Sequence, residues 1–286
     1  MGLDAKRFYF GVTQKFNKVW SANINTDSVF TSGTGTVSTY IKTAYVQAQF
    51  LPEAVVQIGS ANAPWIPFVE DLYTFRYVEN TLTDRLKFGT SADWGVHFLG
   101  KHDMVSYNFA AVEGGGYKNP TRSKTMDFEG RVSIEPMKGL VFAVGGYSGD
   151  LGKNSNATPA KQTANRFDLL ASYTTGKLNL GAEYFSQKNW GITANAIGDS
   201  GDGYGVWGQY KFNNVWSIFG RYDSAKPSKD LHPLMRDNYY NIGVQFAVIK
   251  GVLISFVYKN DNIDFPTSAS AVTNYQEFGM FSEIKF

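Results

Sequence analysis

Several features are absent from this chain of 286 residues, and each absence excludes a class of structure or function. There is no cysteine, so no disulfide holds the fold together, as is common in exported proteins and in many cytosolic ones. No run of about 18 or more apolar residues occurs, which excludes a membrane-spanning helix. The formal net charge of +2 is too small to indicate a nucleic-acid-binding protein.

Two further absences concern chemistry and targeting. The three histidines, His97, His102 and His232, lack the spacing of metal ligands, so we expect structural roles, no metal site and no cofactor. The segment Met1 to Phe10 has no apolar core of signal-peptide length. If the protein is exported, we therefore expect this sequence to be a mature or recombinant chain.

What the chain does contain is a strict period of two. At the C-terminus, from Asn274 to Phe286, apolar residues mostly alternate with polar or charged ones, which is the pattern of a strand between two environments. The pattern recurs in segments of about ten residues, the length that a tilted strand needs to cross a bilayer. Short turns and long loops separate these segments alternately. The chain is therefore predicted to be all-β, a transmembrane antiparallel β-barrel forming one domain over residues 1–286.

The clearest segment, from Met126 to Glu135, shows why the barrel would enclose water. Its apolar positions face one way, and its other positions carry Asp127, Glu129, Arg131 and Ser133. Unpaired charges are too costly to bury in a dry core, so these side chains are expected to face a wet lumen.

The strand count has a consequence for closure. We count fifteen strands, as seven hairpins and a C-terminal strand, within an expected range of 14–16. An odd count makes the first and last strands run in the same direction, whereas single-chain bacterial barrels have even numbers. We therefore expect Ala5 to Phe16 to lie at or next to the seam. Either the first strand of a sixteen-stranded barrel is missing, or Met1 to Asp4 is its remnant.

The longest interruption of the alternation is Asn62 to Ser91. Long irregular loops are usually functional or disordered, and this one is too rich in aromatic residues for disorder. We expect it to fold into the lumen and narrow it. The candidate constriction residues are Glu70, Asp71, Arg76, Glu79, Asp84, Arg85 and Lys87.

Two further sets of candidates follow from the alternation. The first is the pore wall, where both charge signs occur: Asp93, His97, Asp127, Glu129, Arg131, Arg166, Asp168, Glu183, Lys211, Arg221 and Lys259. The second is a set of membrane-interface aromatics, which belong at both rims of a barrel: Trp20, Trp94, Tyr107, Tyr173, Tyr184, Tyr204, Tyr210, Trp216, Tyr222, Tyr240 and Phe286. The acidic stretch Asn260 to Ala271 is expected to be a solvated loop rather than a Ca²⁺ site.

A family resemblance adds to this prediction. The order of features between Gln57 and Gly152 resembles the phosphate-selective porin (O and P type) family of Gram-negative bacteria. It is carried by Ile58-Gly59, Pro67-Phe68-Val69-Glu70, Val78-Glu79-Asn80, Asp93-Trp94-Gly95-Val96, Tyr107, Glu113-Gly114, Gly130-Arg131-Val132, Pro136 and Gly145-Gly146-Tyr147. The terminal Phe286 also resembles the C-terminal signal of outer-membrane proteins. The resemblance implies a sixteen-stranded barrel of the bacterial outer membrane, often a homotrimer, whose third loop narrows the lumen.

The first hypothesis for function is a porin, a passive diffusion channel for ions and small hydrophilic solutes with weak charge selectivity, because the predicted wall has mixed charge. Its partners would be outer-membrane lipid and the solutes themselves. An anion- or phosphate-selective porin is the alternative that rests on the resemblance. Two alternatives from other classes are a barrel lipase or protease, with His97 and Ser106 as its only candidate pair, and a structural sheath around a partner protein.

Overall fold

The computed structural model describes residues 5–31, 35–153, 162–193, 197–264 and 272–286. Within these residues the chain forms fifteen strands and two short helices. The strands are β1 (Phe8–Lys15), β2 (Trp20–Thr31), β3 (Thr36–Leu51), β4 (Ala54–Asn62), β5 (Ala92–His102), β6 (Val105–Val112), β7 (Asp127–Met137), β8 (Leu140–Gly149), β9 (Ala164–Thr174), β10 (Leu178–Lys188), β11 (Ser200–Lys211), β12 (Trp216–Lys226), β13 (Arg236–Ile249), β14 (Val252–Asp264) and β15 (Val272–Ile284).

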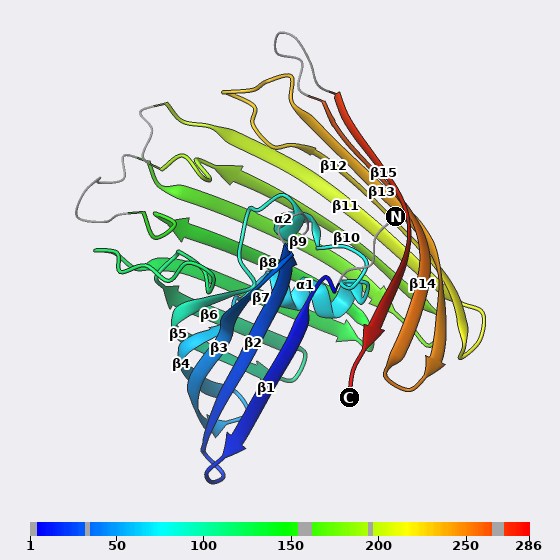
Figure 1. The fold of residues 1–286 in the computed structure, drawn as a ribbon. Coiled ribbons are helices and arrows are strands. Elements are labelled where there is room, and N and C mark those ends of the chain that lie inside the picture. The colour runs from blue at the N-terminus through cyan, green and yellow to red at the C-terminus, as the bar shows by residue number, and fades with distance from the viewer. Residues whose placement is uncertain (1–4, 32–34, 154–161, 194–196, 265–271) are drawn as a thin grey trace.

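Each strand pairs antiparallel with its neighbours in sequence, and all fifteen form one sheet in the order β1 to β15. The sheet curls around the segment between β4 and β5, which lies on its concave side (Figure 1). The prediction of an antiparallel all-β fold with fifteen strands is confirmed.

Apolar side chains point away from this concave side, and polar ones point toward it. On β7, Phe128 and Val132 are exposed on the outer face, whereas Asp127, Glu129 and Arg131 are buried on the inner face. Aromatic residues also meet across strands on the outer face, in the pairs Tyr184–Tyr204, Tyr222–Tyr240 and Tyr258–Phe278. The sheet thus has an apolar outer face and places most of its charged side chains on its inner face, unlike a soluble β-sandwich.

The sheet is not closed. Among the described residues β1 pairs only with β2, and β15 pairs only with β14. Fifteen antiparallel strands place β1 and β15 in the same direction, and they form the two edges of the curled sheet (Figure 1). The first strand lies at the open edge, where the odd count predicted it. Residues Met1 to Asp4 lie outside the described part of the chain.

One expected loop is shorter than predicted. Asn260 to Asp264 continue strand β14 instead of starting a solvated loop, and they pair with β15. The alternation was hidden because four of these five residues are polar, on both faces of the strand. Asp261 on the inner face bonds to an arginine described below, which gives it a structural role.

The segment between β4 and β5 contains the two helices, α1 (Ile66–Tyr73) and α2 (Leu82–Arg85). Pro67 sits in the first turn of α1, where its missing N–H costs nothing, and Thr74 ends the helix in the left-handed conformation. Ile66, Val69 and Tyr73 share the buried side of α1. Neither described helix has the length and apolar character that a membrane crossing requires.

The outward-apolar pattern predicts that neighbouring residues of one strand respond oppositely to a charge. Ile24 on β2 is 48% exposed on the outer face, and Asn25 is half-buried on the inner face. Ile24→Lys should destabilise the folded protein in lipid bilayers by about 2 to 4 kcal/mol, the cost of a lysine facing the bilayer midplane. Asn25→Lys, the matched control, should cost well under half of that. Urea titrations in liposomes measure both values, and equal costs would contradict the assigned faces.

Candidate functional site

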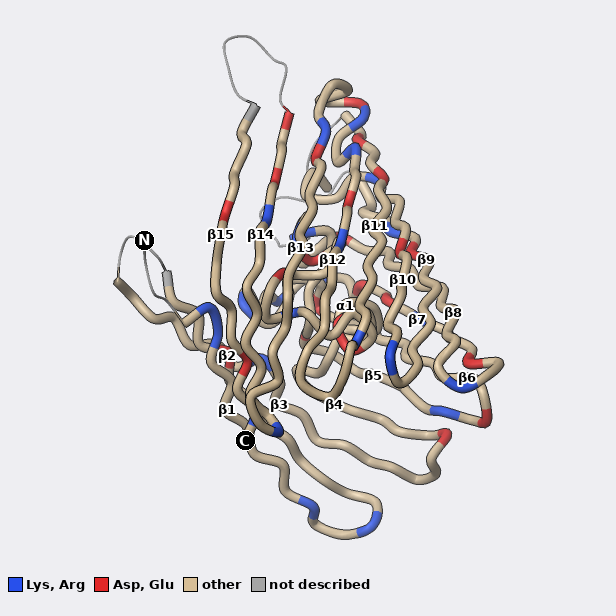
Figure 2. Tube along the Cα trace, turned by 90° about the vertical axis from the view of Figure 1, so that its right-hand side faces the viewer, with Lys and Arg blue, Asp and Glu red and all other residues tan. Residues whose placement is uncertain are grey.

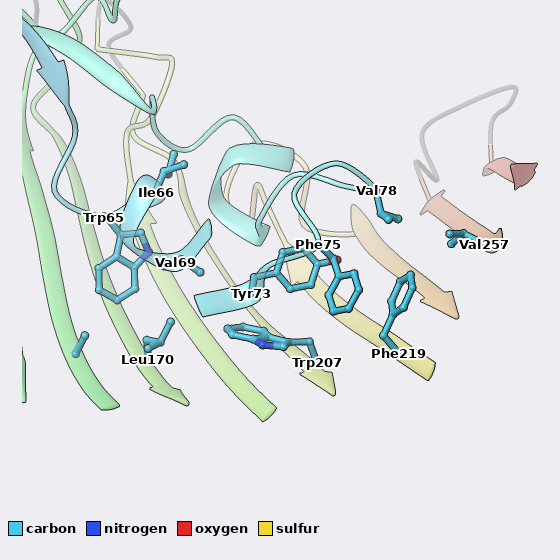
Figure 3. Close-up of a cluster of buried hydrophobic side chains, with 11 residues drawn as sticks. Trp65, Ile66, Val69, Tyr73, Phe75, Val78, Leu170, Trp207, Phe219 and Val257 are labelled. Carbon is cyan, nitrogen blue, oxygen red and sulfur yellow. The ribbon is translucent and has the colours of Figure 1, made fainter. Parts of the chain in front are cut away.

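The segment from residue 62 to residue 91, called the internal loop below, packs against the inner face of the strands from β8 to β14 (Figure 3). The Phe75 ring stacks on Phe219 of β12 with 4.0 Å between centroids, and Tyr73 meets Trp207 of β11 edge-on at 5.6 Å. The buried cluster comprises Trp65, Ile66, Val69, Tyr73, Phe75 and Val78 of the internal loop with Ala143, Leu170, Trp207, Phe219 and Val257 of the wall. This cluster is a main hydrophobic core of the molecule, and it lies inside the curl of the sheet.

Arg85 of α2 anchors the internal loop electrostatically. Its guanidinium lies 3.2 Å from Asp223 of β12, 2.6 Å from Asp237 of β13 and 3.3 Å from Asp261 of β14. It also lies 4.7 Å from the centre of the Tyr239 ring. Burial lowers the pKa of Arg85, but Asp223 and Asp237 outweigh burial and raise it above its ordinary value. One loop side chain therefore bridges three neighbouring strands as a permanent cation.

The wall anchors the internal loop in return. Four basic side chains of the wall donate hydrogen bonds to loop carbonyl oxygens, in the pairs Arg131–Pro64, Arg166–Phe88, Arg221–Asn80 and Lys259–Val78. Glu183 of β10 accepts a hydrogen bond from the backbone N–H of Leu82 at 3.0 Å. Charged wall groups thus satisfy the polar backbone of an irregular segment that would otherwise lose hydrogen bonds on burial.

The seven candidate constriction residues divide into two groups. Arg85 and Glu79 are anchors, because Glu79 pairs with Lys259 at 3.2 Å on the wall. Arg76 pairs with Glu70 and with Asp84, the latter at 3.0 Å, within the internal loop itself. Asp71 and Lys87 are exposed. Five of the seven, Glu70, Asp71, Arg76, Asp84 and Lys87, therefore remain candidates for the narrow zone.

Ten of the eleven candidate wall residues are buried, and Lys211 is exposed. Arg166, for example, pairs with Glu129 at 2.7 Å and with Asp168 at 2.8 Å under the internal loop. Asp127 accepts hydrogen bonds from the backbone N–H groups of Asp150 and Leu151. These side chains point inward as the alternation predicted, but many of their hydrogen-bonding groups are bonded to loops that cover the wall. Figure 2 shows charges of both signs along the strands around α1.

On the inner face of β1 to β4, uncharged polar side chains form hydrogen bonds with one another. Asn23 donates to Thr13 at 2.9 Å and accepts from Thr43 at 2.5 Å, and Gln57 donates to Gln47 at 2.8 Å. On the turn side of the internal loop, a cavity of about 460 Å³ is also lined by polar inward side chains, among them Asn179, Gln209, Ser217 and Gln245. Amides and hydroxyls such as these suit hydrated solutes of either charge.

Opposite charges face each other between the internal loop and the uncovered wall. Surrounding protein raises the pKa of Asp71 above its ordinary value, and the positive charges of Lys285 and Lys42 oppose that rise. Lys42 of β3 and Lys285 after β15 therefore lie within electrostatic reach of Asp71. Lys42 was not predicted to point inward, and Lys118, which lies in the loop after β6, was not predicted as a site residue at all.

The eleven candidate interface aromatics all lie on or near the outer surface. Trp94, Tyr107 and Tyr173 are half-buried. The other eight are exposed: Trp20, Tyr184, Tyr204, Tyr210, Trp216, Tyr222, Tyr240 and Phe286.

The candidate nucleophilic pair is not assembled. His97 on β5 is fully buried and lies opposite Ala110 of β6, whereas Ser106 lies opposite Lys101 nearer the turn. The Ser106 hydroxyl instead shares a hydrogen bond of 2.6 Å with Ser133. Among the described residues, no group of three or more His, Asp or Glu side chains is arranged to hold a metal ion.

Comparison with known proteins shows the fold. No protein-family model matches the sequence, and no curated protein matches it. Among solved structures the chain is similar to OmpF of Salmonella typhi, with a TM-score of 0.68 and 12% identity over 97% of this chain and 89% of that one. It is also similar to the anion-selective porin from Comamonas acidovorans, with a TM-score of 0.65 and 10% identity over 97% and 87%.

A third similar structure is the trimer form of OmpT, an outer membrane protein of Vibrio cholerae, with a TM-score of 0.59 and 12% identity over 97% and 89%. At such low identities these likenesses establish an outer-membrane β-barrel fold, that of Gram-negative porins. They single out no porin family, so the resemblance to the phosphate-selective type has no support beyond its motifs.

Removal of the Arg85 anchor should loosen the internal loop. Arg85→Ala leaves Asp237 and Asp261 without their arginine in a poorly hydrated place, at a cost of about 3 kcal/mol. In planar bilayers the variant should show larger mean single-channel conductance and more current noise than the parent protein. Lys138→Ala, which removes an exposed cation in the turn between β7 and β8, is the control. Arg85→Ala traces that match this control would contradict an anchoring role.

The anchor formed by Glu79 should persist into acid. Burial raises the pKa of Glu79, but Lys259 and Lys6 outweigh burial and lower it from 4.5 to about 2. Because the folded-state pKa is depressed, its stabilising effect is complete above about pH 4.5 and declines as the pH falls toward 2. The difference in unfolding free energy between the parent and Glu79→Gln should therefore stay constant from pH 7, where Lys6 with its pKa lowered to about 8 is still charged, to pH 4.5, and shrink below that. The control, Glu113→Gln, removes a carboxyl that lies outside this anchor. A difference that already shrinks between pH 7 and 5 would refute the assignment.

Proposed function

We propose that the protein is a porin of the bacterial outer membrane, a passive diffusion channel for ions and small hydrophilic solutes with weak charge selectivity. The observation that carries the proposal is the inner face of β1 to β4, where uncharged polar side chains form hydrogen bonds with one another and β1 is exposed along its whole length. A polar interior behind an apolar outer face is the arrangement of a water-filled barrel. The outer-membrane β-barrel fold supports the same location and function.

The weak selectivity follows from the charges of the narrow zone. Strong selectivity requires a ring of charges of one sign. Here the internal loop presents Glu70, Asp71 and Asp84 with Arg76, and the facing wall presents basic residues that include Lys42. A cation and an anion each meet one attractive and one repulsive side. A homotrimer is part of the proposal, by analogy with the trimer form of the Vibrio cholerae protein.

The test is a reversal potential across a planar bilayer under a KCl gradient. We expect channels with a reversal potential near zero, within about a quarter of the Nernst potential of either ion. A potential close to that of chloride would replace the proposal with an anion-selective porin. Purified, folded protein that inserts into the bilayer and carries no current would rule out a diffusion channel.

A further inference from the structure

A row of inward side chains crosses the first three strands near their loop ends. Tyr9 of β1 pairs with Asp27 of β2, which pairs with Tyr40 of β3. Asp27 is fully buried, and it accepts a hydrogen bond of 2.5 Å from the hydroxyl of Tyr117, a residue of the loop after β6. Two cations flank the same carboxylate, Arg7 at 3.8 Å and Lys118 at 4.0 Å.

A β-bulge in β3 determines the positions of Tyr40 and Lys42. The pairing of β2 with β3 shifts between Asn25, which lies opposite Thr43, and Thr26, which lies opposite Ile41. Lys42 is therefore the extra residue, without a partner position on β2. A bulge of this kind reverses the alternation beyond it and redirects side chains. It turns Tyr40 to the inner face and brings the Lys42 ammonium 4.9 Å from the centre of the Tyr9 ring.

The tyrosine rings hold the cations without neutralising them. The Lys118 ammonium lies 5.2 Å from the Tyr40 ring and 5.6 Å from the Tyr117 ring, and these two rings meet edge-on at 6.4 Å. Arg7 donates to the Tyr9 hydroxyl at 3.0 Å. An aromatic face attracts a cation but leaves its full charge and remaining donors available. The side chains of Arg7 and Lys118 are 22% and 41% exposed, so both are accessible from the lumen.

We propose that Arg7, Lys42 and Lys118 form a subsite for a small doubly charged oxyanion that passes through the channel. Three cations and the single carboxylate of Asp27 leave two positive charges, which a dianion balances and chloride does not. The inference rests on the proposed function, because it places the subsite on the wall of a diffusion pathway. The internal loop weakens the subsite, since Asp71 lies within electrostatic reach of Lys42, and Asp84, together with its partner Arg76, lies within reach of Lys118. Weak binding is what conduction through a site requires.

The first test measures binding without any current. The full-length protein, folded in detergent, is treated with an amine-acetylating reagent in chloride or in sulfate at equal ionic strength, and modification is followed by mass spectrometry. Sulfate should slow acetylation of Lys42 and Lys118 at least threefold. The control is Lys101, an exposed lysine near a turn that pairs with Glu135 at 3.6 Å. Equal slowing at all three lysines, or at none, would overturn the subsite.

The second test measures the same binding in the channel. Sulfate added to KCl should reduce the chloride current to a plateau, at concentrations that saturate. Lys42→Gln should raise the half-blocking concentration about tenfold, Tyr40→Leu should raise it severalfold, and Tyr40→Phe, which keeps the aromatic face, should leave it unchanged. Lys101→Gln should also leave it unchanged. If the current fell in proportion to the sulfate concentration without a plateau, or if all variants had the same half-blocking concentration, sulfate would not bind at this subsite.

The two tests separate this inference from the proposed function. Lysine protection without channel currents would support the subsite and refute the diffusion channel. Currents without protection or saturating block would support the channel and refute the subsite. If Lys42→Gln does not fold, the protection and the plateau seen in the parent protein still decide the question.

Discussion

The inward direction of the polar side chains is the constraint on which the rest of this structure depends. Because apolar residues occupy the outer face, the internal loop meets many buried polar and charged side chains inside the sheet as well as an apolar patch. A charge can be buried there only with a partner. The internal loop supplies partners of two kinds. Arg85 forms ion pairs with acidic residues of three strands, and backbone carbonyl oxygens of the loop accept hydrogen bonds from basic wall residues such as Arg221. Its aromatic residues then fill the remaining space against Trp207 and Phe219.

The alternation of single strands could be predicted because it is a local property. The outer and inner faces of β7, the count of fifteen strands and the position of β1 at an open edge all follow from period two and from the spacing of turns. The β-bulge at Lys42 could not be predicted, because it depends on the register between β2 and β3 and leaves no mark in the sequence of β3 alone. As a result Tyr40 and Lys42 were not recognised as inward residues.

The candidate site was harder to predict than the fold. The alternation tells which side chains point inward, but not which other residues cover them. Arg166 and Asp168 point inward as predicted, yet they are buried against each other and under the internal loop. The same holds for Arg85, a candidate constriction residue that is an anchor. The aromatic content of residues 62–91 indicated packing, but not against which strands. The hydrogen bonds between the internal loop and the wall join residues 67 to 181 positions apart, which no local pattern encodes.

The position of the internal loop affects both how the loop is anchored and how strongly the facing wall attracts anions. Arg85 and the wall hydrogen bonds hold the internal loop against β8 to β14. In that position Asp71, which is exposed, and Asp84, which pairs with Arg76, lie within electrostatic reach of Lys42 and Lys118. There they reduce the attraction that Lys42 and Lys118 exert on an anion. Screening over about 8 Å at physiological ionic strength limits this effect to charges that are close together. A displacement of the internal loop by more than this distance would remove the opposing acids while the wall cations stayed in place. In the proposed channel, the loop anchor would therefore determine both the width of the pathway and the balance of charge along it.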